Sequence, residues 1–334
     1  MSGSTVGDGV IAGNKRLAIC LPTYNRCELL KISLPMLISA VRKHGIKIYV
    51  SDNQSDDETA PVVRNLMGQY ELLHYSKTSR LLTADEHFEW VLNLPDTEYR
   101  WLFGDRYKII SEAGLGHLVS AVEEDFDVVV VNGEARVHDV PTQSFNEENA
   151  VLEQLGWHMT MLTALIYRSS AIAKMNFTRY RGTHFLQTLS IFEFLSTTNF
   201  TLRWLSDPLI GSVRFDVRNG WLQQAIQVFV RGWFLGVMSL PAKYSYQAKV
   251  RALMSHDANT AVFGLKGVLK VRALGGVTFG LLRSHARELS YTVARMRIVY
   301  LWISLLLPVS AVRLAVRVYR RWHSHMAQES SDGG

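Results

Sequence analysis

The stretch WLFGDRYKII, residues 101–110, decides how the chain folds. Its first half is an apolar, aromatic run that predicts a buried strand, and this strand ends at Gly104 and Asp105. An acidic residue at the carboxyl end of a strand is typical of the ligand-binding edge of an α/β protein. Arg106 and Tyr107 then stand where further carboxylates would complete a metal site. The stretch therefore predicts a strand-end site with an incomplete set of metal ligands.

The residues before this stretch alternate between short apolar runs and helical patterns. Strands are predicted at 17–21, 46–50, 71–76 and 99–103, and helices at 27–44 around a kink at Pro35, from Ser55, Asp56 and Asp57 to Met67, and at 84–94. Strands separated by helices of this length imply right-handed crossovers and a mostly parallel sheet with helices on both faces. The predicted fold class is α/β, with ligands bound at the carboxyl ends of the strands.

Polar residues follow the first two predicted strands as well. In PTYNR, residues 22–26, Pro22 is expected to stop the ladder, and the side chains after it can present hydroxyl, amide and guanidinium groups. In SDNQSDDE, residues 51–58, Asp52 and Asn53 offer an acceptor and a donor suited to a base edge. Each residue type alone is more frequent in turns and caps than in ligand contacts. Together they share one predicted rim with Asp105.

Three segments, LAICLPTYNR, IYVSDNQSDDET and YRWLFGDRYKI, occur in this order and at strand ends. They resemble the nucleotide-sugar half of family 2 glycosyltransferases with the GT-A fold, nearest to the abequosyltransferase-like branch that acts in O-antigen and exopolysaccharide synthesis. The resemblance covers residues 15–115 and fades afterwards. It implies a Rossmann-like GT-A domain that takes a nucleotide-diphosphate sugar as its donor substrate.

The resemblance also implies roles for individual residues. The loop around the nucleoside would be Pro22, Thr23, Tyr24, Asn25 and Arg26; Asp52, with Asn53 beside it, would bind the base; Asp105 would be the first acid of the DxD-like signature; Arg80 would lie near the diphosphate. His87 stands where relatives often carry Asn, and a half-buried packing role is an equal alternative for it.

The signature departs from the family at its last position. In typical members that acid coordinates Mg²⁺ or Mn²⁺ at the diphosphate, but here it is Tyr107, a poor ligand for a hard cation. Arg106 can replace the ion, since a guanidinium binds a diphosphate bidentately, which would make the transfer metal-independent. A cation held weakly by Asp105 and water is a second reading. A third is a non-catalytic nucleotide-sugar-binding or scaffolding subunit.

The general base must come from the second half of the chain, where 126–139 predicts a buried strand and 161–171 a strand followed by a helix start. The resemblance implies inverting transfer, which needs a carboxylate or imidazole that accepts the proton of the acceptor hydroxyl. The residues themselves leave retaining transfer open. His184, after a Gly-Thr turn, is the first choice. The other candidates are Glu134, Asp139, Glu193 and Asp207.

Basic residues concentrate near the carboxyl terminus. Residues 260–327 contain eleven Lys and Arg against the single acid Glu288, a net charge of +10 in a chain whose total is +6. Within this segment lies the uncharged run 298–312, which is too short to span a bilayer and is interrupted by Pro308. An in-plane membrane anchor is favoured, with Arg313, Arg317, Arg320 and Arg321 on anionic headgroups and Val312, Val316, Tyr319 and Trp322 below them. A core helix with a solvated basic face is the alternative, and nucleic acid is not expected as a partner.

These observations predict four segments: a flexible tail at 1–14, the donor half at 15–115, the acceptor half at 116–240 and a helical, basic extension at 241–334. Cys20 and Cys27 form neither a disulfide framework nor a metal-ligand spacing, and the opening residues lack a leader pattern, which predicts cytoplasmic synthesis. Together with the resemblance, they predict a peripheral enzyme on the cytoplasmic face of the membrane, acting on a polyprenyl-diphosphate-linked glycan.

Overall fold

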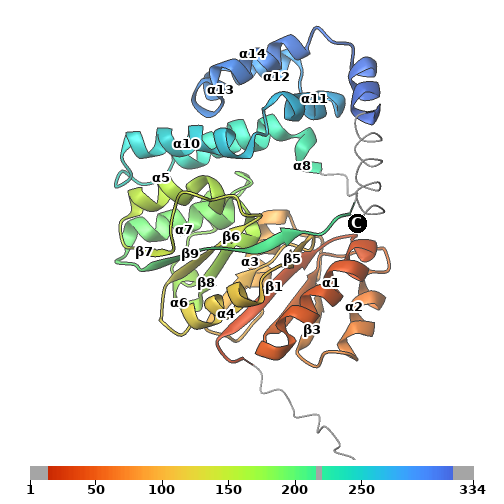
Figure 1. The fold of residues 1–334 in the computed structure, drawn as a ribbon, viewed down its shortest axis with the longest axis vertical. Helices are drawn as coiled ribbons and strands as arrows, with labels where there is room; N and C mark the ends of the chain where they lie inside the picture. The colour runs from red at the N-terminus through yellow and green to blue at the C-terminus, as the bar shows by residue number, and fades with distance from the viewer. Residues whose placement is uncertain (1–13, 216–219, 319–334) are drawn as a thin grey trace, which may run out of the picture. The chain divides into compact units, whose positions relative to one another are not determined.

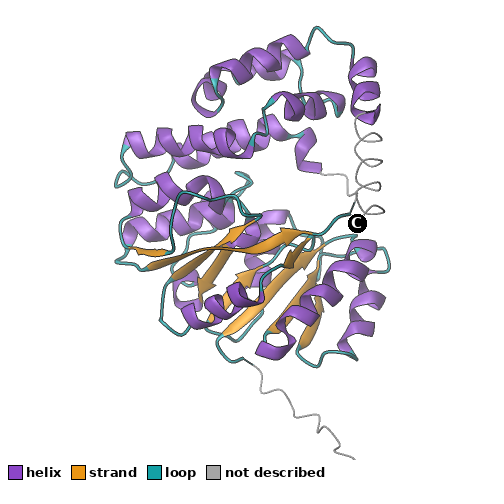
Figure 2. Ribbon diagram, viewed as in Figure 1, coloured by secondary structure: helices purple, strands orange, loops and turns teal. Residues whose placement is uncertain are grey.

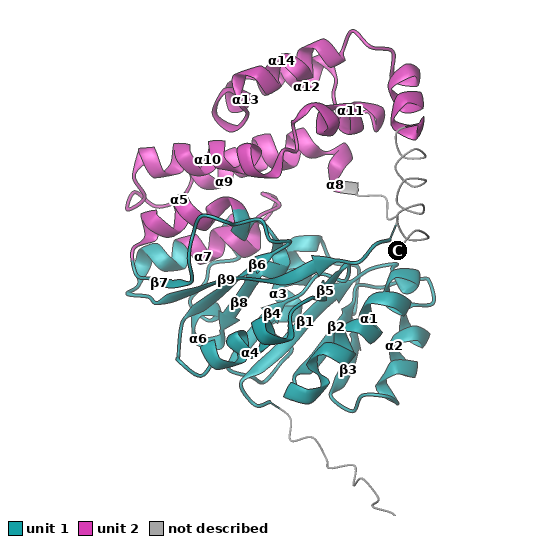
Figure 3. Ribbon diagram, viewed as in Figure 1, with its two compact units in different colours: residues 1–146, 158–179, 193–215 teal, residues 147–157, 180–192, 216–334 magenta. Residues whose placement is uncertain are grey.

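The computed structural model describes residues 14–215 and 220–318, and the predicted tail at 1–14 lies almost wholly outside them. Cα packing divides the chain into two compact units (Figure 3). Unit 1 comprises residues 1–146, 158–179 and 193–215, and unit 2 comprises 147–157, 180–192 and 216–334. The predicted boundaries at residues 115 and 240, which separate donor, acceptor and anchoring functions, stay predictions.

Unit 1 is built on one nine-stranded sheet, seen in Figure 2 with helices packed against it. Its strands are β1 Leu17–Thr23, β2 Lys47–Asp52, β3 Leu73–Lys77, β4 Tyr99–Leu102, β5 Tyr107–Ile109, β6 Val128–Gly133, β7 Gln143–Phe145, β8 Leu165–Arg168 and β9 Leu202–Ser212. Their order is β3-β2-β1-β4-β8-β6-β9-β5, with β7 pairing β9. The first four strands are parallel, whereas β8 runs antiparallel to both of its neighbours.

The helices between the first strands follow the predicted alternation (Figure 1). They are α1 Cys27–Val41, which continues through Pro35 into a 3₁₀ turn at Arg42–His44, α2 Thr59–Met67, α3 Ala84–Leu92, α4 Glu112–Ala121 and α6 Ser169–Ile172. Right-handed crossovers place α1 and α2 on one face of the sheet, because the chain moves outward from β1 to β3, and α3 on the other, because it returns to β4. The α/β fold class is confirmed.

The prediction that Pro22 ends the first strand is wrong, because β1 continues through Pro22 to Thr23, which pairs with Asp52 of β2. The Cys20 carbonyl accepts a hydrogen bond from Phe103 N at 2.8 Å, so even-numbered residues of β1 face β4. Since β4 ends at Leu102, no strand stands opposite Pro22 to receive the missing N–H.

The core of unit 1 contains large aromatic side chains whose polar atoms are satisfied. Trp101 is fully buried and donates its indole N–H to the Thr163 carbonyl at 2.8 Å. Trp204 of β9 bonds the Val140 carbonyl in the same way at 3.0 Å. These anchors fix β4 and β9, the two strands that lead to the site, because a buried indole contributes both apolar area and a directional bond.

Unit 2 is helical. It contains α8 Gly220–Gln223, a π-helical segment Ile226–Gly232 that continues into α9 Trp233–Met238, α10 Tyr246–Thr260, α11 Leu265–Ala273, α12 Phe279–Ser284, α13 Ala286–Thr292, α14 Arg295–Ser304 and a last helix Val309–Val318. Helices α5 Glu148–Met159 and α7 Leu186–Thr197 have residues in both units. Phe263, Val271, Leu289 and Leu301 are among the buried side chains that join α10–α14.

Two predictions about the carboxyl-terminal helices can be compared with these bounds. The break at Pro308 is confirmed, because α14 ends at Ser304, the next helix starts at Val309, and the two are bent by 111°. The predicted apolar face of the last helix is wrong in part, because Val312 is buried and only 3% exposed, while Leu314 and Val318 point outward at 63% and 59%. Tyr319, Arg320, Arg321 and Trp322 lie outside the described residues.

Candidate functional site

The sheet order reverses its direction between β1 and β4, which makes a topological switch point there. The chain runs outward from β1 to β3 and then returns to the other side of β1, so the crossover helices leave the carboxyl ends of β1 and β4 open between them. Thr23 at the end of β1 and Asp105 just beyond β4 meet there, with the Thr23 hydroxyl donating to Asp105 Oδ2 at 3.2 Å. Open α/β sheets bind ligands at this kind of switch point. Residues of the first and fourth predicted strand ends are therefore brought together.

Two guanidinium groups interact electrostatically with Asp105. Burial raises the pKa of this carboxyl, while the charge of Arg26, the hydrogen bond from Thr23 and the charge of Arg106 act in the opposite direction. Arg26 immediately precedes α1, and Arg106 lies in the same turn as Asp105. The charge at this rim is therefore predominantly positive, as an anionic ligand requires.

Residues 104–107 form a tight turn in which Tyr107 N donates to the Gly104 carbonyl at 3.1 Å. Tyr107 begins β5, a strand that the sequence did not predict, and pairs with Ser212 of β9. A Cβ on Gly104 would lie only 3.0 Å from Tyr107 Cδ2 and 3.3 Å from Thr163 Oγ1, so the Tyr107 ring packs closely over the glycine. Tyr107 thus has a structural role in this turn.

Glu134 joins this rim from the end of β6. It adopts a left-handed conformation with φ 56°, and its carboxylate accepts hydrogen bonds from the Ser212 hydroxyl and, at 2.8 Å, from Arg136. Although burial opposes ionisation, these bonds and the charges of Arg136 and Arg106 lower the pKa of Glu134. Because Ser212 is the cross-strand partner of Tyr107, Glu134 lies beside the 104–107 turn.

The sequence predicted Glu134 only as one of several possible bases, and it did not predict Arg136 or Ser212. A signal was available in NGEAR, residues 132–136, which follows four consecutive valines. A buried strand that ends in charged residues is the pattern that identified Asp105. Ser212 gave no such signal, because only the sheet register places it here.

The donor chemistry of this rim does not fit a tightly held divalent cation. Hard cations prefer several free carboxylate or carbonyl oxygens, whereas both carboxylates of the rim are engaged: Asp105 by Thr23 and the charges of two arginines, and Glu134 by Ser212 and Arg136. Among residues 14–215 and 220–318, no three His, Cys, Asp or Glu side chains are grouped so that they could hold a metal.

The predicted nucleoside loops are joined to each other by hydrogen bonds. Asn25, with φ 50°, donates its N–H to Ser55 Oγ at 2.9 Å, and its side-chain oxygen accepts from Asp56 N at 3.0 Å. Asp57 accepts from the Cys27 and Thr59 amides at the starts of α1 and α2, although the N-cap residue of α2 is Glu58, one residue after the predicted cap, and its side chain makes no cap bond. Tyr24, at 46% exposure, presents its ring on this loop.

Asp52 and Asn53 have internal partners. Asp52 is fully buried; its Oδ1 accepts from Ser55 N at 2.8 Å and its Oδ2 from the Tyr75 hydroxyl at 2.7 Å. The Asn53 side chain donates to the Leu82 carbonyl and accepts from Leu82 N. These contacts order the loops after β2 and β3, and a contact of either residue with a base stays a prediction that requires the loops to open.

Arg80 and His87 also have structural contacts. Arg80 is exposed and pairs with Glu86 at 2.9 Å, which belongs to the capping box of α3, so its predicted place near a diphosphate stays a prediction. His87 is buried on α3 with Nε2 2.9 Å from Ser51 Oγ, and burial lowers its pKa to about 4. His87 is therefore neutral near pH 7, as a packing residue should be.

The other predicted bases lie in different surroundings. Glu193 pairs with Arg179 at 3.0 Å, which compensates its charge on an otherwise apolar helix. Asp207 is exposed and 3.0 Å from His117, and Asp139 is exposed in the loop after β6. His184 is exposed before α7 in unit 2, with φ 68°, whereas Asp105, Arg106 and Glu134 belong to unit 1.

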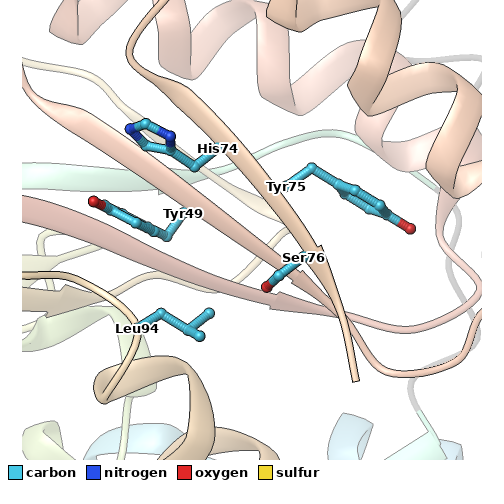
Figure 4. A pocket seen from close by; sticks show the side chains of 5 residues that line it. All are labelled: Tyr49, His74, Tyr75, Ser76 and Leu94. Atoms are coloured by element: carbon cyan, nitrogen blue, oxygen red, sulfur yellow. The ribbon is translucent and has the colours of Figure 1, made fainter. Parts of the chain in front are cut away.

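A small pocket of about 200 Å³ lies near the edge strand β3, and none of the predicted site residues lines it. Figure 4 shows Tyr49, His74, Ser76 and Leu94 around it, with the Tyr75 ring directed away. The Tyr49 and His74 rings are stacked with centroids 4.6 Å apart, and burial lowers the pKa of His74. Tyr49 and His74 are paired within β2 and β3, upstream of the strand ends that form the rim.

Neither a protein-family model nor a curated protein matches the sequence, but solved structures match the fold. TarS 1–349 from S. aureus in complex with UDP-GlcNAc has a TM-score of 0.56 at 14% identity, covering 92% of each chain. The mannosyltransferase PcManGT from Pyrobaculum calidifontis in complex with GDP-Man and Mn²⁺ has a TM-score of 0.52 at 15% identity, covering 90% of this chain and 91% of that one. Both are GT-A glycosyltransferases, and the predicted GT-A fold is confirmed.

Proposed function

We propose that this chain is a glycosyltransferase that moves one sugar from a nucleotide-diphosphate donor to a glycan acceptor. The observation that carries the proposal is the Thr23–Asp105 contact at the switch point of the sheet, flanked by the guanidinium groups of Arg26 and Arg106. A diphosphate carries the negative charge that such a rim attracts. The structural neighbours support a nucleotide-sugar donor, since one was solved with UDP-GlcNAc and the other with GDP-Man.

In this reaction the acceptor hydroxyl oxygen bonds to the anomeric carbon of the donor. The bond between that carbon and the diphosphate breaks, and the nucleoside diphosphate leaves with the electron pair. We propose that Arg106 stabilises the developing negative charge by bidentate hydrogen bonds, with Arg26 and Arg136 adding to the positive field. The chain's own residues would thus do the work of charge neutralisation, and the transfer would not depend on a divalent ion.

Glu134 and His184 are the two bases to be compared. Glu134 is ionised near neutral pH, because its pKa is lowered, and it lies beside Arg106 and Tyr107. An ionised carboxylate can accept the hydroxyl proton of the acceptor. His184 is the choice that the sequence favoured. We propose Glu134 as the base of an inverting transfer, with His184 as the alternative.

The finer assignment concerns the acceptor and the place of action. We propose a polyprenyl-diphosphate-linked glycan in O-antigen or exopolysaccharide synthesis, of the abequosyltransferase-like kind, at the cytoplasmic face of the membrane. The support is the resemblance of the three sequence motifs and the net charge of +10 in residues 260–327. Anionic headgroups would attract this segment and keep the enzyme near its acceptor.

Release of nucleoside diphosphate from a panel of UDP-, GDP- and dTDP-sugars, with lipid-linked acceptors, tests the proposal. We expect turnover with one donor, and turnover that persists in EDTA. Arg106→Ala should lower kcat by about 10²–10³, because it removes a donor to the leaving group. Arg251→Ala, an exposed surface arginine paired with Glu153, is the matched control and should have no effect.

Two results would contradict the proposal. Donor binding without turnover in any combination would favour the scaffolding subunit, and loss of turnover in EDTA would show that a cation is required. Glu134→Gln and His184→Gln then separate the two bases. If Glu134 is the base, Glu134→Gln should lose kcat with little change in KM, and His184→Gln should keep both. If His184 is the base, the two results should be reversed.

A further inference from the structure

The outward face of α14 is apolar. Met296, Val299 and Ile303 follow one another at helical spacing and are 64%, 45% and 52% exposed, and Leu306 just beyond the helix is 81% exposed. The opposite face is anchored, since Leu301 and Ser304 are buried. A surface helix of a soluble domain normally turns polar residues outward, so this face requires a partner.

Aromatic side chains extend this face onto α12. Phe279, the first residue of α12, is 60% exposed and contacts Trp302 of α14 edge to face, with ring centroids 5.7 Å apart. We call the surface formed by Phe279, Met296, Val299, Trp302, Ile303 and Leu306 the α14 patch. Its exposed aromatic rings resemble those that locate at the boundary between lipid chains and headgroups.

The bend after α14 is held in place by Arg272. This side chain donates from Nε to the Ser304 carbonyl at 3.2 Å and from a terminal nitrogen to the Val277 carbonyl at 2.8 Å. Ser304 is the last residue of α14, where free carbonyls and the helix dipole favour a cation. The bonds of Arg272 therefore fix the backbone at the bend that exposes Leu306.

The charges on the same helices are almost all positive. Arg283 of α12 and Arg295 of α14 are exposed on the elements that carry the α14 patch, and Arg317 is exposed on the last helix. Glu288 is the single acid in residues 260–318. Two copies of this surface placed face to face would bring cations against cations, which disfavours a self-interface. Anionic headgroups match both its apolar and its charged parts.

We infer that the α14 patch docks onto a bilayer containing anionic lipids, with α14 lying in the plane of the headgroups and Phe279, Ile303 and Leu306 inserted among the acyl chains. No single described helix is long and apolar enough to cross a membrane, and α14 with the last helix passes that test only as a pair bent by 111°. A ten-residue helix spans about 15 Å, half of a hydrocarbon core. The inference deepens the proposed function by naming the surface that would hold the enzyme beside a lipid-linked acceptor.

Sedimentation of the full chain with vesicles tests the inference. We use phosphatidylcholine alone and phosphatidylcholine mixed with phosphatidylglycerol, and the double variant Ile303→Glu with Leu306→Glu. We expect the variant to bind the mixed vesicles about tenfold or more weakly, because two inserted side chains become charged. Met254→Glu, which changes a 51% exposed residue of α10, is the matched control and should bind like the unmodified chain. Melting temperatures verify that both variants fold.

The arginines are tested separately. Arg283→Gln with Arg295→Gln should weaken binding to the mixed vesicles by about fivefold per residue and leave binding to phosphatidylcholine unchanged. Equal sedimentation of the Ile303→Glu and Leu306→Glu variant would overturn the inference. So would a dimer of the unmodified chain that this variant dissociates, since the patch would then be a self-interface.

Failure of the proposed function is distinguishable from failure of docking. If vesicle binding depends on the α14 patch but no donor is turned over, docking stands and glycosyl transfer does not. If donors are turned over on a short soluble acceptor but vesicles are not bound, transfer stands and docking does not.

Discussion

The strand-end rim of unit 1 and the carboxyl-terminal helices of unit 2 use charge in opposite ways. At the rim, guanidinium groups interact with carboxylates, as Arg106 does with Asp105 and Arg136 with Glu134. On residues 260–318, arginines meet almost no acids, and several bond backbone carbonyls at helix ends. This contrast in charge is why we propose a compact anionic ligand for the rim and an extended anionic surface for the helices.

The largest effect should come from removing Asp257, the buried acid of α10. Its carboxylate pairs with Arg297 at 3.0 Å and accepts from the amides of Phe263 and Ala294, so it joins α10 to the start of α14. Asp257→Ala should destabilise these helices by about 3–4 kcal/mol, because the half-buried Arg297 loses its carboxylate and the amides of Phe263 and Ala294 lose their acceptor. Hydrogen exchange of residues 246–318 measures the loss.

Glu153→Ala is the control for this prediction. Glu153 pairs with the largely exposed Arg251, and removal of such a surface pair should cost less than about 1 kcal/mol. Equal losses in the two variants would show that Asp257 does not organise the helices more than a surface acid does.

The sequence predicted the first four strands of unit 1 well, for a physical reason. β1, β2 and β4 are short, largely apolar runs followed by polar residues, a pattern left by burial on both faces of a parallel sheet, whereas the edge strand β3 is half-buried. β5 was missed because it has only three half-buried residues, and its pairing with β9 depends on residues about a hundred positions away. The closeness of Glu134 to the 104–107 turn was missed for the same reason.

The helical region was predicted less completely. Its existence, its charge and the break at Pro308 follow from local composition, which a sequence shows directly. Which face turns inward depends on packing against other helices, and there the prediction placed the buried Val312 outside. The outward apolar face of α14 could not be distinguished from a core face by its spacing alone, because both have the same period.

Acid should affect unit 1 through two buried histidines. Burial lowers the pKa of His87 and of His158 to about 4, against an ordinary 6.5. Both are neutral in the folded state, so their full contribution is present above pH 6.5 and is lost as the pH falls toward 4. Protonating each histidine in the folded state therefore costs on the order of 3 kcal/mol.

His87→Gln isolates one of these two contributions. Glutamine can still bond the Ser51 hydroxyl but does not titrate, so thermal melts of the variant should depend less on pH between 6.5 and 4 than those of the unmodified chain. Identical pH profiles would contradict the neutral assignment of His87. Because both histidines belong to unit 1, we expect hydrogen exchange in α10–α14 to stay unchanged between pH 6.5 and 4, which would separate the two units by their response to acid.

The smallest expected effect comes from removing a helix N-cap, a feature that both units share. In unit 1, Thr83 caps α3 by accepting from Glu86 N at 3.3 Å, and Glu86 accepts in return from Thr83 N at 2.8 Å. In unit 2, Ser245 caps α10 by accepting from Ala248 N at 3.0 Å. Thr83→Ala and Ser245→Ala should each destabilise their helix by about 1 kcal/mol, because one amide at the helix start loses its partner.

Site-resolved hydrogen exchange at the first turns of α3 and α10 measures these losses, with Thr83→Ser and Ser245→Thr as controls that retain a hydroxyl. The loss at Thr83 should exceed that at Ser245 slightly, since the capping box there is reciprocal. A loss confined to one unit would mean that the regions differ in how firmly their helices are held as well as in how their charges are arranged. Equal losses would leave charge placement as the property that separates the rim from the helices.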